Sequence, residues 1–200
     1  MTHAKQIQEI RDRARQRMAE GAVTDDYGLD RNQAIAVLNE ALATELVCTL
    51  RYRFHYFMAT GIHSQAAKDE FLEHAKEEQE HADWIAERIK QLGGKPEMNP
   101  AGLTARSHSE YREGNSLAEM LKEDLVAERI AIESYREMIR FFGEKDPTSR
   151  RLMERILEVE EEHADEIADL LYAQSETGEP RKLYFEDEVP DTSKAGQKAN

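Results

Sequence analysis

Residues 78–83 read Glu-Gln-Glu-His-Ala-Asp, and residues 160–165 read Glu-Glu-Glu-His-Ala-Asp. In both copies a glutamate stands three residues before a histidine, so the two side chains share one face of an α-helix, about one turn apart. Apolar residues recur around both copies at steps of three and four residues, which is the period of an amphipathic helix. The chain therefore contains an internal repeat, and the repeated unit is helical.

A second motif precedes each copy at a matched position. Glu45 is followed seven residues later by Tyr52, and Glu128 is followed seven residues later by Tyr135. Seven residues turn a helix back to within about 20° of its starting direction, so each glutamate and its tyrosine share a face. The sequence thus contains two near-copies of a helix pair, and each copy supplies Glu, Tyr, Glu and His at equivalent places.

Four long helices are expected from the periodicity and from the residues that bound it. Asp30 and Ser116 begin capping boxes, Ser64 is a further cap, and Asp146 precedes a proline at the first helical position. Glycines follow the expected ends of the first three helices. The predicted helices span residues 30–59, 64–92, 116–142 and 146–175.

The connections between these helices predict the topology. Residues 60–63 and 143–145 are short loops, which make antiparallel neighbours, whereas residues 93–115 are enough to run the length of a bundle. We therefore predict an all-α fold, a four-helix bundle of two antiparallel hairpins with a long crossover between helices two and three. The predicted organisation is a polar, partly helical N-terminal extension (1–29), the bundle (30–175) and a polar C-terminal tail (176–200).

Composition excludes several classes of protein. The 41 acidic and 27 basic side chains leave a formal net charge of −14, which opposes binding to DNA through bulk electrostatics. Cys48 is the only cysteine, so an internal disulfide framework and a cysteine-rich zinc site are excluded. No apolar stretch is expected to reach a membrane span, and residues 1–20 show no apolar signal segment. We expect a cytoplasmic protein with no membrane partner and no DNA partner.

The repeated glutamates fall at positions that face the core. Glu45 lies three residues after Leu42, so the two share a helix face. Apolar residues three, four or seven positions away likewise share a face with Glu78, Glu128 and Glu160. Four bare carboxylates in an apolar core would repel one another and carry a large desolvation cost. Two divalent cations resolve this, because four positive charges then meet four negative ones, with one neutral imidazole for each metal. Oxygen and nitrogen ligands of this kind suit iron or manganese.

A glutamate on each of two helices, with Glu-x-x-His on each of the other two, is the ligand pattern of ferritin-like di-iron and di-manganese proteins. Over residues 30–172 the chain resembles this superfamily, and bacterioferritins most closely, which implies a ferritin-like bundle. The resemblance implies that one metal binds Glu45 and His81, that the other binds Glu128 and His163, and that the remaining two glutamates bridge the metals. The implied catalytic residues are Glu45, Glu78, His81, Glu128, Glu160, His163 and Tyr52, of which all but Tyr52 bind metal.

The resemblance also implies a function. Each chain would bind two Fe(II) ions, and O2 or H2O2 would oxidise both, so the protein would be a ferroxidase that stores or detoxifies iron in a homo-oligomeric shell, a 24-mer or a 12-mer. Manganese in place of iron remains an alternative. Haem is not expected, because Gln79 stands where the resemblance places the haem-ligating methionine of bacterioferritins. A di-metal peroxidase, a manganese catalase and a di-iron oxygenase are alternatives on the same bundle. A non-enzymatic helical assembly protein is the alternative from a different class.

Several residues near the motifs are expected to have structural roles. His74, one turn before the first repeated motif, is expected to be a core histidine with satisfied hydrogen bonds, and an auxiliary metal ligand is the alternative. Asp124 and Glu77 are expected to be solvated charges, and a role in delivering cations is the alternative for Asp124. Tyr135 is expected to be a core tyrosine whose hydroxyl bonds across the bundle, and Cys48 a small buried apolar residue.

Overall fold

The computed structural model describes residues 3–61 and 64–173, and helices account for most of them. Within these residues there is no strand, so the predicted all-α class is confirmed. The tail predicted at 176–200 lies outside the described residues. The elements are α1 (His3–Arg13), η1 (Met18–Glu20), α2 (Arg31–Met58), α3 (Ser64–Gln91), η2 (Pro100–Gly102), α4 (Leu103–Arg106), α5 (Leu117–Phe142) and α6 (Pro147–Ala173).

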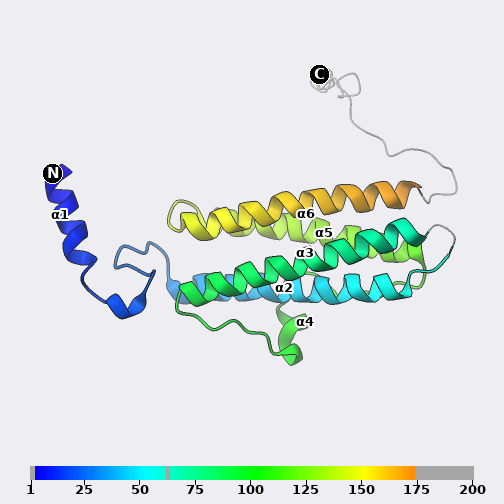
Figure 1. Cartoon of the computed structure of the whole chain (residues 1–200), viewed down its shortest axis with the longest axis horizontal. Coiled ribbons are helices and arrows are strands. Elements are labelled where there is room, and N and C mark those ends of the chain that lie inside the picture. Colours follow the sequence, from blue (N-terminus) through cyan, green and yellow to red (C-terminus); the bar gives the residue numbers. More distant parts are fainter. Residues whose placement is uncertain (1–2, 62–63, 174–200) are drawn as a thin grey trace, which may run out of the picture.

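Four of these helices form an elongated bundle (Figure 1). α2 packs against α3 and α5 packs against α6 along their lengths, while α2 also meets α5 and α3 also meets α6. Figure 1 shows that the two helices of each hairpin run in opposite directions, and that the chain between α3 and α5 returns from one end of the bundle to the other. The predicted pair of antiparallel hairpins joined by a long crossover is confirmed, and the crossover carries the short helices η2 and α4.

Side-chain caps define where the bundle helices begin. Asp30 accepts hydrogen bonds from two backbone N–H groups in the first turn of α2, and Ser116 accepts one from the first turn of α5. The cap predicted at Ser64 is wrong. Ser64 is the first residue of α3, one position inside the helix, and from there its hydroxyl donates to the carbonyl of Gly61 over 2.8 Å.

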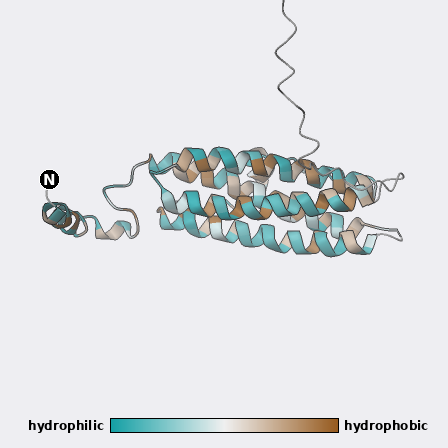
Figure 2. Cartoon of the chain, turned by 90° about the horizontal axis from the view of Figure 1, so that it is seen from above, coloured by the Kyte–Doolittle hydropathy of each residue, from teal (hydrophilic) through white to brown (hydrophobic). Residues whose placement is uncertain are grey.

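A layer of charged side chains divides the core of the bundle into two apolar clusters. Figure 2 shows hydrophilic and hydrophobic bands alternating along each bundle helix, as expected for helices that bury one face. One cluster includes Leu38, Leu42, Ile85 and Phe142. The other includes Tyr52, Phe71, Leu121 and Ile167. Apolar packing on both sides therefore holds the four helices in register around the charged layer.

The segment before α2 is partly helical, and only its last part touches the bundle. α1 buries none of its residues and lies apart from the bundle in both Figure 1 and Figure 2. Val23, Tyr27 and Leu29 pack against the first apolar cluster. The Tyr27 hydroxyl also donates to the carboxylate of Asp146 over 2.8 Å, which ties the extension to the start of α6.

One described helix, α2, contains an 18-residue stretch with a mean hydropathy of 1.2, which is long and apolar enough to cross a membrane. The expectation that no stretch does so is therefore wrong. The bundle accounts for this composition, because 61% of that apolar stretch is buried inside the protein. The same helix also buries the ionisable side chains of Glu45 and Arg51 against the other helices.

Candidate metal centre

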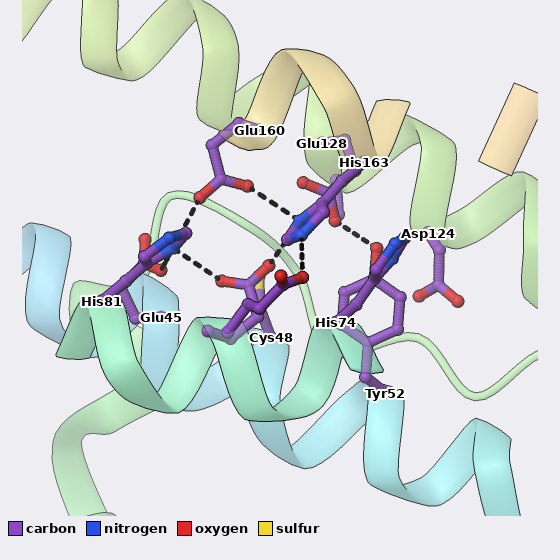
Figure 3. Close-up of polar contacts among 12 residues, drawn as sticks. Glu45, Cys48, Tyr52, His74, His81, Asp124, Glu128, Glu160 and His163 are labelled. Atoms are coloured by element: carbon purple, nitrogen blue, oxygen red, sulfur yellow. Dashed lines mark hydrogen bonds and ion pairs between the residues drawn. The ribbon is translucent and has the colours of Figure 1, made fainter. Parts of the chain in front are cut away.

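The structure brings the six predicted ligand side chains together inside the bundle. Figure 3 labels five of them, Glu45, His81, Glu128, Glu160 and His163. α2 and α5 supply one each, and α3 and α6 supply two each. Because Glu-x-x-His spans one helical turn, α3 and α6 each direct a carboxylate and an imidazole toward the same point. Each of the six residues is only 1% exposed: Glu45, Glu78, His81, Glu128, Glu160 and His163.

These side chains form two overlapping ligand sets, in each of which the ligand atoms lie within 4.8 Å of one another. The first set is Glu45, Glu78, His81 and Glu160, and the second is Glu78, Glu128, Glu160 and His163. Nδ1 of His81 lies 3.2 Å from Glu45 and 3.1 Å from Glu160. Nδ1 of His163 lies 3.5 Å from Glu78 and 3.7 Å from Glu160. Each set can hold one cation, and the two shared carboxylates can bridge a pair.

Two tyrosines hold the unshared glutamates. The Tyr52 hydroxyl donates to Glu128, and the Tyr135 hydroxyl donates to Glu45. Burial raises the pKa of both tyrosines well above its usual value, so both hydroxyls keep their protons and act as donors at neutral pH. Tyr135 bonds across the bundle as expected, but its acceptor is a predicted ligand. Each hairpin therefore positions a glutamate that belongs to the other.

When no cation is bound, the surroundings of the centre favour the protonated forms of two of its glutamates and both of its histidines. Burial raises the pKa of Glu45 and of Glu128, and the charges of neighbouring carboxylates raise both further. Burial alone would lower the pKa of His81, but its contacts with Glu160 and Glu45 outweigh burial and raise it to about 10. The contacts of His163 with Glu160 and other carboxylates raise its pKa in the same way. Bound metal therefore competes with protons for these atoms.

Several buried atoms of the centre have no hydrogen-bond partner among the described residues. They are one oxygen of Glu78, one of Glu128, both of Glu160 and Nδ1 of His163. One oxygen of Glu160 lies 3.1 Å from Nδ1 of His81 without forming a hydrogen bond to it. Buried polar atoms are normally paired, so this unpaired set of oxygen and nitrogen ligands fits iron or manganese ions.

Glu77 is attached to the centre, so the prediction that it is a solvated charge is wrong. Nε2 of His163 donates to Glu77 over 2.8 Å, and the Glu77 side chain is 40% exposed. The hydrogen bond orients the imidazole so that Nδ1 faces the shared carboxylates. Its neighbours Glu73 and Glu80 are exposed.

The prediction that Asp124 is solvated is also wrong. Asp124 is fully buried and accepts hydrogen bonds from Arg51 and from His55, each over 2.8 Å. Arg51 also donates to the carbonyl of Glu110, and His55 to that of Glu113, so the network ties the crossover to α2 and α5. The available signal was the spacing of Arg51 and His55, which stand four residues apart on one face of α2.

A bundle with Glu-x-x-His on two helices and a further glutamate on each of the other two defines the class of carboxylate-bridged di-metal proteins. The chain belongs to the ferritin-like domain family, whose family model matches residues 35–174. The resemblance inferred from the sequence is thereby confirmed.

Relatives of this chain carry bacterioferritin and DNA-protection names. A bacterioferritin of Desulfovibrio desulfuricans is 32% identical over 66% of this chain and 70% of its own. A solved structure of a bacterioferritin from the same species, reported with a diiron site, has a TM-score of 0.65 at 26% identity and covers 74% of this chain and 84% of its own. A DNA protection during starvation protein of Pyrococcus furiosus is 31% identical over 76% of this chain and 82% of its own. The solved structure of a dodecameric thioferritin of Bacteroides fragilis has a TM-score of 0.69 at 32% identity, and the match covers 72% of this chain and 87% of that one.

Proposed function

We propose that the protein is a ferroxidase that stores or detoxifies iron by oxidising Fe(II) at a di-iron site inside each chain. The observation that carries this proposal is the pair of buried ligand sets that share Glu78 and Glu160. The bacterioferritin names of several relatives, and the diiron site named for one of them, support iron as the metal.

In this proposal every side chain of the centre has one role. Glu45 and His81 bind one Fe(II), Glu128 and His163 bind the other, and Glu78 and Glu160 bridge them. Tyr52 holds Glu128 through its hydrogen bond, and Tyr135 holds Glu45 in the same way. Two ions about 3.5–4 Å apart on shared carboxylates can act together on one oxidant molecule.

The electron count explains why two ions are needed. Each Fe(II) gives one electron and becomes Fe(III). One O2 takes two electrons and two protons and leaves as H2O2, whereas one H2O2 takes two electrons and two protons and leaves as two water molecules. Because both electrons reach the oxidant at one site, no single-electron product of the oxidant is released.

The double variant Glu78→Gln/Glu160→Gln tests the site. Amide side chains keep the volume but remove both bridging charges, so Fe(II) oxidation should slow by about 100-fold or more. The measurement is stopped-flow oxidation in air after anaerobic loading with Fe(II). Glu73→Gln/Glu162→Gln removes the same charge from exposed positions on the same two helices and should oxidise Fe(II) at the wild-type rate. Unchanged oxidation by the first variant would overturn the proposal.

The proposal includes a homo-oligomeric shell in the cytoplasm. The similarity to a dodecameric thioferritin supports a shell of twelve chains, and the 24-mer is the other size considered. A di-metal peroxidase, a manganese catalase or a di-iron oxygenase would use the same ligands without needing a storage cavity. DNA is not proposed as a partner, because the formal net charge of −14 opposes binding to the DNA phosphates.

A further inference from the structure

His74 is buried like a core residue but is not hydrogen-bonded like one. His74 is 1% exposed, and its Nδ1 has no hydrogen-bond partner among the described residues. His55 shows the contrast, because one of its nitrogens meets Asp124 and the other meets backbone carbonyls of the crossover. The expectation that His74 is a satisfied core histidine is therefore wrong, and its position needs another explanation.

The other nitrogen of His74 faces two carboxylates that are open to solvent. Nε2 lies 2.9 Å from Glu166 and 3.7 Å from Glu70, and the three ligand atoms lie within 4.8 Å of one another. The Glu166 side chain is 43% exposed and that of Glu70 is 33% exposed. Two carboxylates and one imidazole, reachable from water, match the charge and the ligand preference of a divalent metal ion.

The same histidine connects this group to the di-metal centre. Figure 3 shows the ring of His74 beside that of His163, and their centroids are 3.9 Å apart with the planes inclined by 23°. His74 also forms a second potential ligand set with Glu77 and His163. On its other side His163 faces the bridging carboxylates through Nδ1. Three ligand sets that share members thus lead from the protein surface to the centre.

We propose that Glu70, His74 and Glu166 form an auxiliary binding site for a divalent metal ion. The imidazole of His163 separates this site from the di-metal centre. The existence of this site depends only on its own three side chains. Its cation is Fe(II) on its way to the centre, and this identity rests on the proposed ferroxidase function.

Anaerobic titration of the full-length, metal-free protein with Co(II) tests the site, because Co(II) is not oxidised under these conditions and its visible absorption reports nitrogen and oxygen ligands. Calorimetry should count about three ions per chain in the wild type, two in the centre and one outside it. Glu70→Gln/Glu166→Gln should lose one ion, or bind it at least about tenfold more weakly. Both positions are partly exposed, so this variant should keep the wild-type circular dichroism.

Two further variants make the result unambiguous. Glu73→Gln/Glu162→Gln removes two exposed charges from the same helices and should bind as many Co(II) ions as the wild type. Glu78→Gln/Glu160→Gln should weaken the centre and keep the auxiliary ion. If Glu70→Gln/Glu166→Gln binds the same number of ions as the wild type with the same affinities, the auxiliary site does not exist. If the auxiliary ion binds but the centre holds none in any protein, the proposed function fails and the auxiliary site stands.

Discussion

At the scale of the residue, the centre depends on hydrogen bonds that hold its carboxylates in place. Tyr52 donates to Glu128 and Tyr135 donates to Glu45, and both hydroxyls are buried among charged groups. Removing such a donor leaves a ligand free to rotate without removing the ligand itself.

Tyr52→Phe and Tyr135→Phe should therefore each weaken metal binding by about tenfold while the protein stays folded. The measurement is anaerobic Fe(II) titration, with thermal unfolding as the check on the fold. Tyr56→Phe is the matched control, because Tyr56 lies on α2 next to the second apolar cluster and takes no part in the centre. Equal Fe(II) affinities in all four proteins would contradict the positioning role of the tyrosines.

Metal binding should release protons at pH 7. The raised pKa of Glu45, Glu128, His81 and His163 means that the metal-free centre holds protons that the metal must displace. Metal affinity should accordingly rise as the pH is raised from 6 to 8. Calorimetry with Co(II) in two buffers of different ionisation enthalpy measures the number of protons released. The same heat in both buffers would show that no proton leaves.

At the scale of the element, Asp146 joins three segments at the start of α6. It accepts hydrogen bonds from the N–H and hydroxyl of Ser149, from Arg88 of α3 and from Tyr27 of the extension. Asp146→Ala removes the cap and these partners together, so it should lower the free energy of unfolding by about 2 kcal/mol. Glu144→Ala, at an exposed position two residues earlier, should change it little.

The effect of Asp146→Ala should depend on pH with a definite sign. Burial would raise the pKa of Asp146, but its hydrogen bonds with Ser149 and Tyr27 and the charge of Arg88 lower it. A carboxyl group with a lowered pKa stabilises the fold above its unfolded pKa of about 3.9, and this contribution disappears as the pH falls through the folded value. The difference between wild type and variant in urea unfolding should be constant down to about pH 4 and shrink below it. A difference that grows below pH 4 would contradict this account.

The buried pair of Arg51 and Asp124 ties α2 to α5. Asp124→Asn leaves the buried guanidinium of Arg51 without its counter-charge, and such a loss typically costs about 3–5 kcal/mol. Glu133→Gln, at an exposed position on the same helix, is the control and should cost less than about 0.5 kcal/mol. Urea unfolding at one protein concentration compares the three proteins, because assembly adds to apparent stability. Equal midpoints would mean that the pair is not needed for stability.

At the scale of the whole molecule, storage of oxidised iron requires an enclosed space that one bundle does not provide. Twelve chains of 23.0 kDa would form a particle of about 280 kDa. Light scattering during gel filtration measures this mass directly. A mass of one or two chains would exclude a storage shell and favour the peroxidase, catalase or oxygenase alternatives on the same site.

The internal repeat was enough to predict the bundle and the six candidate ligands. Helical periodicity is local, so residues three, four and seven apart reveal which face turns inward before any partner helix is known. The errors at Asp124 and Glu77 concern side chains whose partners lie on other elements. Asp124 was expected in solvent because its partners Arg51 and His55 come from α2, and Glu77 because His163 comes from α6.

The amino-acid sequence by itself determined the four long helices, their order and the inward register of Glu45, Glu78, Glu128 and Glu160. The tertiary structure alone decided that Tyr52 supports a glutamate of the opposite hairpin, that a buried ion pair joins α2 to α5, and that His74 stacks on His163. The physical reason is the range of the interactions. A helical turn involves neighbours four residues apart, whereas contacts between helices depend on the rotation and offset at which their apolar faces pack.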